Sequence, residues 1–424
     1  MISFIRLFAK RLVTMVGGEA MQSALHFGVN ICLLRTLSAH DYGVFALVMV
    51  IGGLSLTYVR ALVAMPASIW IGLSRDRGAA NAYQATFGSA ALLLVSAISV
   101  IVAFILYGWL GTSPLAGSAF VGLWSLRSYL RTAVFARGKV KPAVTGDMVF
   151  TISGAMLMTA LLWSGVGDQL QASLGSLALA NGLSIAVMLI APQCSIRLSL
   201  RRSVWRRYLR LWRQLVWSGV GVTAINLQGQ GMALVVAVLA GPAAYAPIAA
   251  MLVMFSPVRL VDGAVANMIQ PDLAYHAARG EYDAVWRQAG ICTLIMGCGS
   301  ILYGTAVMVI LPRYDLRVFE GTSMRVILSL VWALYAASEL RVMPRIILEV
   351  AGSLRAIAII SGISAVVGMT IVAAVLAVAA PEWSLVGAVV SEVMALVGFC
   401  LTLTSSMGAH LWKGPIGRRK WLAG

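Results

Sequence analysis

The sequence consists of long apolar runs separated by short polar breaks. Twelve of these runs are long enough for a helix of the roughly 20 residues that cross a bilayer. They lie near 12–35, 43–64, 80–110, 114–136, 143–165, 170–192, 214–240, 243–268, 289–311, 323–346, 356–379 and 385–408. The pattern predicts an all-α polytopic membrane protein with about twelve transmembrane helices.

The composition supports this interpretation. Of the 424 residues, 60% are hydrophobic and only 11% are charged, whereas an average soluble domain has about 25% charged residues. The mean hydropathy is +0.89. These values exclude a soluble enzyme and leave room for little besides the spans.

The basic residues outnumber the acidic ones by 32 to 15. In a soluble protein such an excess would suggest nucleic acid, but here the basic residues gather in alternate connections between the spans. The positive-inside rule then places both termini of this multi-pass membrane protein in the cytoplasm. The charge reflects topology, and no nucleic-acid partner is expected.

The longest inner connection, SIRLSLRRSVWRRYLRLWRQ, separates six spans from six. It predicts an N-terminal bundle at 1–194, a linker at 195–213 and a C-terminal bundle with a short basic tail at 214–424. At 100° per residue, most linker arginines share one arc and the aromatic and aliphatic residues share the other. The linker is therefore predicted to be an amphipathic helix at the membrane surface, with anionic lipids as partners.

A weak internal repeat supports two equivalent halves. The segment LRTLSAHDYGVFALVMV aligns with VLAGPAAYAPIAAMLVMF, which places Tyr42 on Tyr245 at an offset of 203 residues. Six spans followed by six in the same orientation is the parallel repeat of many transporters. We predict two six-helix bundles related by a pseudo-two-fold axis along the membrane normal.

The first span carries a polar stripe formed by Glu19, Gln22, Ser23, His26 and Asn30. Such a stripe would be costly against lipid, so it must face protein or a water-filled cavity. Polar groups also hold membrane helices together, and this alternative stays open. The ionisable Glu19 favours a cavity, with possible coupling to protons or another cation.

Arginines within the even-numbered spans indicate a functional cavity more specifically than the polar stripe does. They are Arg60, Arg127, Arg131, Arg259, Arg341 and Arg345. They predict a cationic cavity biased toward the cytoplasm, because guanidinium groups stay charged and suit phosphate oxygens. For Arg60 and Arg345 the alternative is that their long side chains extend to the cytoplasmic surface of the membrane and place the charge in water.

Arg127 and Arg131 share a helix face and have no acid within one turn on their own span. Their partner must come from another helix, water or the substrate, and a substrate diphosphate would fit. Asp147 is expected near the membrane surface. Elsewhere, Arg259 has Asp262 three residues away as a possible partner, whereas Glu339 and Glu392 would have to meet arginines across helices.

Motifs for catalysis are missing from the sequence. It contains no HExxH, GxSxG or Walker-type motif, its four histidines are far apart, and its five cysteines form no CxxC pair. We expect no metal, no cofactor, no ATP hydrolysis and no enzymatic activity.

Several segments together resemble the polysaccharide biosynthesis branch of the multidrug/oligosaccharidyl-lipid/polysaccharide exporter superfamily. They are the charged first helix, LRTLSAHDYGVFAL, and QPDLAYHAARGEYDAVWRQA after the eighth span. The resemblance implies a flippase that moves polyprenyl-pyrophosphate-linked oligosaccharides from the cytoplasmic to the periplasmic leaflet of the bacterial inner membrane by alternating access. It also implies arginines that contact the anionic substrate and a cavity acid for coupling, with a polymerase and glycosyltransferases as further partners.

Three other functions compete with this one. A multidrug exporter of the same superfamily would need cavity acids for cationic substrates, and the arginines argue against it. A peptidoglycan-precursor flippase would have two more spans, for which there is no room after residue 408. A membrane-embedded polysaccharide polymerase or acyltransferase would need a large outer loop or a histidine cluster.

Overall fold

The computed structural model describes residues 2–73, 77–165, 167–190, 199, 201–313 and 317–404. The described chain is helical throughout, which confirms the all-α prediction. It forms two compact units, Met1–Thr223 and Ala224–Gly424.

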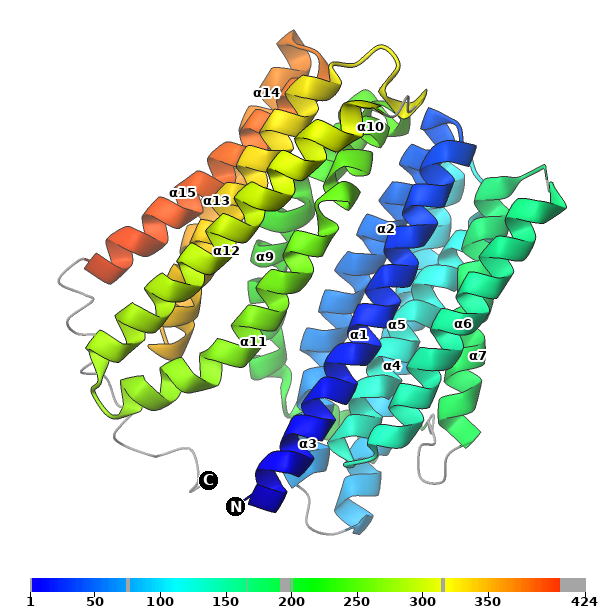
Figure 1. The fold of residues 1–424 in the computed structure, drawn as a ribbon. Helices are drawn as coiled ribbons and strands as arrows, with labels where there is room; N and C mark the ends of the chain where they lie inside the picture. Colours follow the sequence, from blue (N-terminus) through cyan, green and yellow to red (C-terminus); the bar gives the residue numbers. More distant parts are fainter. Residues whose placement is uncertain are drawn as a thin grey trace. The chain divides into compact units, whose positions relative to one another are not determined.

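In the first unit the long helices lie side by side (Figure 1). The second of them is interrupted by a π-helical turn, η1. The elements are α1 (Ile2–Thr36), α2 (Ala39–Val59), η1 (Arg60–Ala64), α3 (Met65–Leu73), α4 (Arg77–Gly108), α5 (Pro114–Ala136), α6 (Val140–Ser164), α7 (Gln169–Ile190), α8 (Arg202–Leu209) and the start of α9 (Trp212–Ala240).

The second unit repeats this order of helices. After the remainder of α9 come α10 (Pro242–Met254), α11 (Ser256–Ala278), α12 (Tyr282–Ile310), α13 (Met324–Val350), α14 (Leu354–Val378) and α15 (Leu385–Thr404), with short 3₁₀ turns η2 (Leu311–Arg313), η3 (Arg317–Phe319) and η4 (Pro381–Ser384). Tyr42 and Tyr245, which the sequence repeat aligns, are each the fourth residue of their helix and are buried. The symmetry axis between the units stays a prediction.

Within the described ranges, nine helices are long and apolar enough to cross a membrane, and the chain is a polytopic membrane protein. The other three expected spans coincide with α1, α5 and the pair α10–α11. Several helices extend beyond the apolar runs that predicted them. For example, α12 begins at Tyr282 and α11 continues to Ala278, because polar turns at a membrane surface can stay helical.

Small residues allow close helix packing in both units. A Cβ atom on Gly52 of α2 would lie 2.6 Å from the ring of Trp124 on α5. A Cβ atom on Gly387 of α15 would lie 2.6 Å from the carbonyl oxygen of Gly368 on α14, so those two backbones touch. Membrane helices commonly associate through such contacts, since lipid offers no hydrophobic drive.

The second long helix of each unit is interrupted at a proline. In the first unit Pro66 follows η1, and in the second unit Pro257 follows the break at Phe255 between α10 and α11. A proline has no N–H to donate to the carbonyl four residues earlier. Hydroxyl groups from other helices donate to carbonyls near both breaks.

The predicted linker contains the helix α8. Among the linker residues that the structure describes, 199 and 201–213, α8 is followed by a turn at 210–211 that separates it from α9, which begins at Trp212. The first turns of α9 pack in the first unit, where the hydroxyls of Thr223 and Tyr58 lie 2.8 Å apart. These contacts explain why the division between units falls after Thr223.

Candidate functional site

A buried charge cluster lies inside the first unit, where α5, α6 and α7 pack together. Arg127 on α5 is 2% exposed and Asp147 on α6 is 1% exposed. Nη2 of Arg127 donates to Oδ1 of Asp147 at 2.8 Å, and its Nε donates to Oγ of Ser184 at 2.9 Å. Nη1 donates to Oδ1 of Asn181 at 3.4 Å. All three nitrogens of this guanidinium group therefore have protein acceptors.

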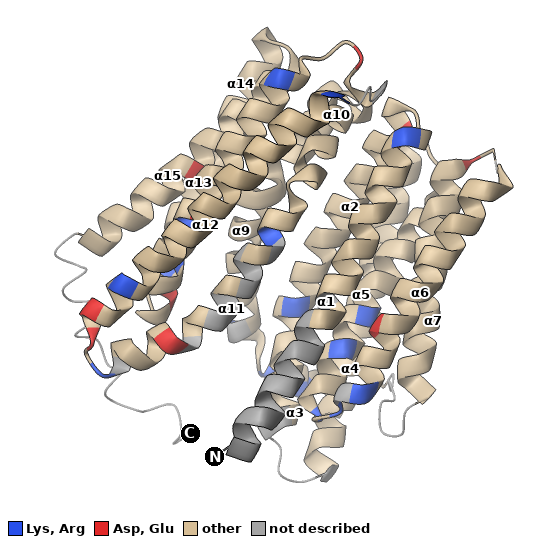
Figure 2. Cartoon of the chain, viewed as in Figure 1, with Lys and Arg blue, Asp and Glu red and all other residues tan. Residues whose placement is uncertain are grey.

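Arg131 shares the same carboxylate. Its Nε donates to Oδ2 of Asp147 at 2.9 Å, and its side chain is 16% exposed. Each guanidinium group also lies over an aromatic ring, Arg127 at 4.0 Å from the ring centre of Phe150 and Arg131 at 5.2 Å from that of Phe135. Figure 2 shows a red band beside blue bands where α5 and α6 are labelled.

The first helix reaches this cluster through a glycine. A Cβ atom on Gly18 of α1 would lie 2.6 Å from Oδ2 of Asp147. Only a residue without a side chain allows α1 to approach the carboxylate this closely. The same helix packs on α6 again at Gly154, where a Cβ atom would lie 2.7 Å from Leu25.

The polar stripe predicted on α1 lies partly against the cluster. The ring of His26 lies between two aromatic rings, 5.1 Å from Trp124 and 5.6 Å from Phe150 by ring centres. Its two ring nitrogens are buried and have no hydrogen-bond partner among the described residues. Asn30 donates to the carbonyl of His26 at 2.8 Å. Gln22 is half-buried, and the side chain of Glu19 lies outside the described residues.

The second unit holds its own ion pairs. Arg341 on α13 lies 2.5 Å from Glu392 on α15, with the two side chains 15% and 8% exposed. Arg345 pairs with Glu349 one turn later at 2.8 Å. The expectation that Glu392 meets an arginine across helices is confirmed. Glu339 on α13 is buried as well, with 4% exposure.

Two arginines of the predicted set are exposed instead. Arg60, the first residue of η1, and Arg259, near the middle of the α10–α11 segment, have exposed side chains. Neither has an acid within ion-pair distance among the residues the structure describes. The side chain of Asp262, the expected partner of Arg259, lies outside the described residues.

The structure corrects the prediction for Arg127 and Arg131. The vacancy expected for a substrate diphosphate is filled by Asp147, whose side chain is buried against both arginines. The α5–α6 hairpin contains the missed signal. Arg127 and Arg131 lie eleven and seven residues before the turn at Gly138, and Asp147 lies nine residues after it. In an antiparallel hairpin these residues reach the same depth.

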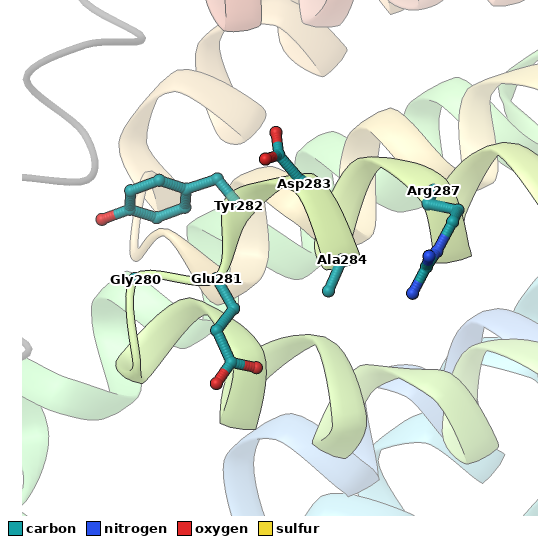
Figure 3. A pocket seen from close by; sticks show the side chains of 6 residues that line it. All are labelled: Gly280, Glu281, Tyr282, Asp283, Ala284 and Arg287. Carbon is teal, nitrogen blue, oxygen red and sulfur yellow. The ribbon is translucent and has the colours of Figure 1, made fainter.

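A surface pocket lies at the turn between α11 and α12. It is lined by Gly280, Glu281, Tyr282, Asp283, Ala284 and Arg287, and Figure 3 shows Glu281 and Arg287 pointing to the same side. Glu281 pairs with His276 at 2.6 Å and with Arg279 at 3.2 Å, so this pocket belongs to a polar turn. Within the described chain no group of three histidine, cysteine or acidic residues could hold a metal ion.

The arrangement of helices matches solved membrane transporters. An inward-facing multidrug resistance MATE transporter of the MOP superfamily superposes with a TM-score of 0.66 and 11% identity, over 93% of this chain and 95% of that one. The chain has the fold of these transporters. A eukaryotic MATE transporter, AtDTX14, gives 0.62 and 14% identity over 96% and 97% of the two chains. The lipid II flippase MurJ in an inward closed conformation gives 0.63 and 10% over 92% and 87%.

The likeness is confined to structure. No protein-family model matches the sequence, and a search of curated proteins found no match.

Proposed function

We propose that the chain is a flippase of the bacterial inner membrane that exports polyprenyl-pyrophosphate-linked oligosaccharides by alternating access. The fold supports a transporter, since MATE exporters and the flippase MurJ share it. The choice of an anionic lipid-linked substrate rests on the charges within the spans.

Two buried acids of the spans are engaged by arginines from other helices. Asp147 is held by two guanidinium groups, and Glu392 by Arg341. A cationic drug would need a carboxylate that can leave its partner, and breaking a buried ion pair costs about 3–5 kcal/mol. These pairs therefore favour a substrate that is not cationic.

The observation that carries the proposal is the exposed side chain of Arg259 near the middle of the α10–α11 segment, which the sequence predicts to be a span. A guanidinium group at bilayer depth is costly against hydrocarbon, so it must face water or an anion. Its planar fork suits the oxygens of a diphosphate. Arg60 is exposed in the same way, whereas Arg127 holds the first unit together.

The remaining expectations belong to the same proposal. Glu19 is the candidate coupling acid because it is the ionisable member of the α1 stripe. A polymerase and glycosyltransferases would use and supply the substrate, and the positive-inside pattern supports a cytoplasmic location for both termini.

A flipping assay tests the proposal. The purified protein is placed in liposomes with a fluorescent polyprenyl-pyrophosphate oligosaccharide, and a membrane-impermeant quencher reports the flipped fraction. Arg259→Gln should slow flipping about tenfold or more, since a charged hydrogen bond contributes about 1.5–3 kcal/mol. Arg259→Lys should restore part of the rate because it keeps the charge without the fork.

The matched control is Arg355→Gln, which removes an exposed arginine at the start of α14. This variant should flip at the wild-type rate. Transport of a cationic dye with no flipping of the lipid would favour a drug exporter instead. Normal flipping by Arg259→Gln would refute the assigned role.

A further inference from the structure

The π-helical turn η1 leaves carbonyl groups in the second span without their ordinary donors. Within the turn, the N–H of Met65 donates to the carbonyl of Arg60, five residues earlier. Pro66 has no N–H, so an α-helix here would leave the carbonyl of Leu62 without a donor. A backbone carbonyl without a partner is costly in a membrane, and another group must satisfy it.

The linker supplies that group. The hydroxyl of Tyr208, on α8, donates to the carbonyl oxygen of Leu62 at 3.1 Å. The hydroxyl of Ser218, on the first turns of α9, donates to the neighbouring carbonyl of Ala61 at 3.4 Å. Burial raises the pKa of Tyr208, so its hydroxyl stays protonated and can donate. Tyr208 of the linker and Ser218 of α9 thus stabilise the interruption of the second span.

One face of α8 is fixed on the first unit. Val204 is buried, and Tyr208 packs edge-on against Phe87 with ring centres 6.2 Å apart. Arg207 donates to Oγ1 of Thr86 at 3.3 Å and lies over the ring of Tyr83 at 5.5 Å. These contacts orient the helix and determine which side chains remain outside.

The opposite face is cationic. Arg202, Arg206 and Arg210 are exposed and follow one another at intervals of four residues, so they share one side of the helix. Leu209 and Trp212 beside them are 59% and 55% exposed. No aspartate or glutamate occurs between Asp168 and Asp262 in the sequence. Arginines flanked by exposed apolar residues are complementary to an anionic lipid surface.

We propose that the exposed arginines of α8 bind the head groups of anionic phospholipids and that this binding holds Tyr208 on the Leu62 carbonyl at the π-helical turn. Lipid composition would thereby control the stability of the interruption in the second span. The inference does not depend on which substrate the protein exports, and both of its tests work without transport.

The first test measures lipid binding. Native mass spectrometry of the purified full-length protein counts retained phosphatidylglycerol and phosphatidylcholine. Wild type should retain phosphatidylglycerol preferentially, and R206Q/R210Q should bind it at least tenfold more weakly, because each basic residue near a charged membrane contributes roughly a fivefold attraction. The control R287Q/R355Q removes two exposed arginines of the second unit and should bind normally.

The second test measures the coupling. Hydrogen exchange of residues 60–73 is compared in nanodiscs of pure phosphatidylcholine and in nanodiscs with added phosphatidylglycerol. Anionic lipid should slow exchange in wild type but not in R206Q/R210Q. Tyr208→Phe should keep lipid binding and lose the protection, whereas Tyr107→Phe, at a side chain 74% exposed, should behave like wild type.

Two outcomes would overturn the proposal. One is unchanged phosphatidylglycerol binding by R206Q/R210Q. The other is lipid-dependent protection of residues 60–73 that survives in Tyr208→Phe. If Tyr208→Phe fails to fold, the lipid dependence of exchange in R206Q/R210Q still decides the question.

Discussion

Asp147→Asn should destabilise the first unit strongly. The substitution keeps the shape of the side chain but removes the charge that two arginines share. Arg127 is 2% exposed and cannot turn to solvent, so its charge would be left buried without a counterion. Breaking a buried ion pair from one side costs about 3–5 kcal/mol, a large part of the roughly 5–15 kcal/mol that stabilises a typical protein.

Thermal unfolding of the purified protein in detergent measures this effect. For a unit of this size, about 2–4 °C is lost per kcal/mol, so the midpoint should fall by roughly 6–20 °C. Asp168→Asn is the matched control, because Asp168 is exposed and asparagine can replace it at the start of α7, where it accepts from the backbone N–H of Gln171. Its effect should stay within about 0.5 kcal/mol.

A double variant tests the physical reason. Arg127→Gln alone should also destabilise, since Asp147, Asn181 and Ser184 each lose a hydrogen-bond donor. Combined with Asp147→Asn, it should recover part of the loss, because no fully buried charge remains, and neighbouring residues couple by about 0.5–3 kcal/mol. Strictly additive losses, or a normal midpoint for Asp147→Asn, would refute the reasoning.

Two further predictions concern packing and the second unit. Gly18→Ala should destabilise by about 1–3 kcal/mol in the same assay, because its Cβ atom would lie 2.6 Å from a carboxylate that two arginines hold in place. Gly17→Ala, whose Cβ atom would meet nothing within 4 Å, should not destabilise, and equal effects would argue against the contact. Glu392→Gln should lower the midpoint by leaving Arg341 without its carboxylate, and adding Arg341→Gln should recover part of that loss.

The sequence predicts the helices well because the bilayer imposes their length and composition. The apolar run at 114–136 coincides with α5, and the run at 170–192 differs from α7 by one residue at its start and two at its end. The two interruptions are harder to predict. Pro66 and Pro257 are visible in the sequence, but the form of each break depends on which hydroxyl groups from distant helices reach the freed carbonyls.

The site is predicted only in part. The arc shared by Arg127 and Arg131 follows from helical spacing, and the structure places both in one cluster. Their partner is not evident from the apolar run of Asp147 alone, since that run indicates a position near the membrane surface. Counting residues from the turn at Gly138 on both sides places the three charges together. No such count identifies Gly18, because its approach to Asp147 depends on how α1 packs against α6.

The break between α10 and α11 has hydroxyl donors that can follow a change in the angle between the two helices. Of the four carbonyls from Met251 to Met254, two accept from the N–H of Phe255. The other two, of Leu252 and Met254, accept from the hydroxyls of Tyr335 and Tyr303. A phenol hydroxyl rotates about its C–O bond, whereas a peptide N–H is fixed in its plane. The angle between α10 and α11 can therefore change while the carbonyls of Leu252 and Met254 keep their donors. A helix can bend in hydrocarbon only if its backbone carbonyls stay hydrogen-bonded.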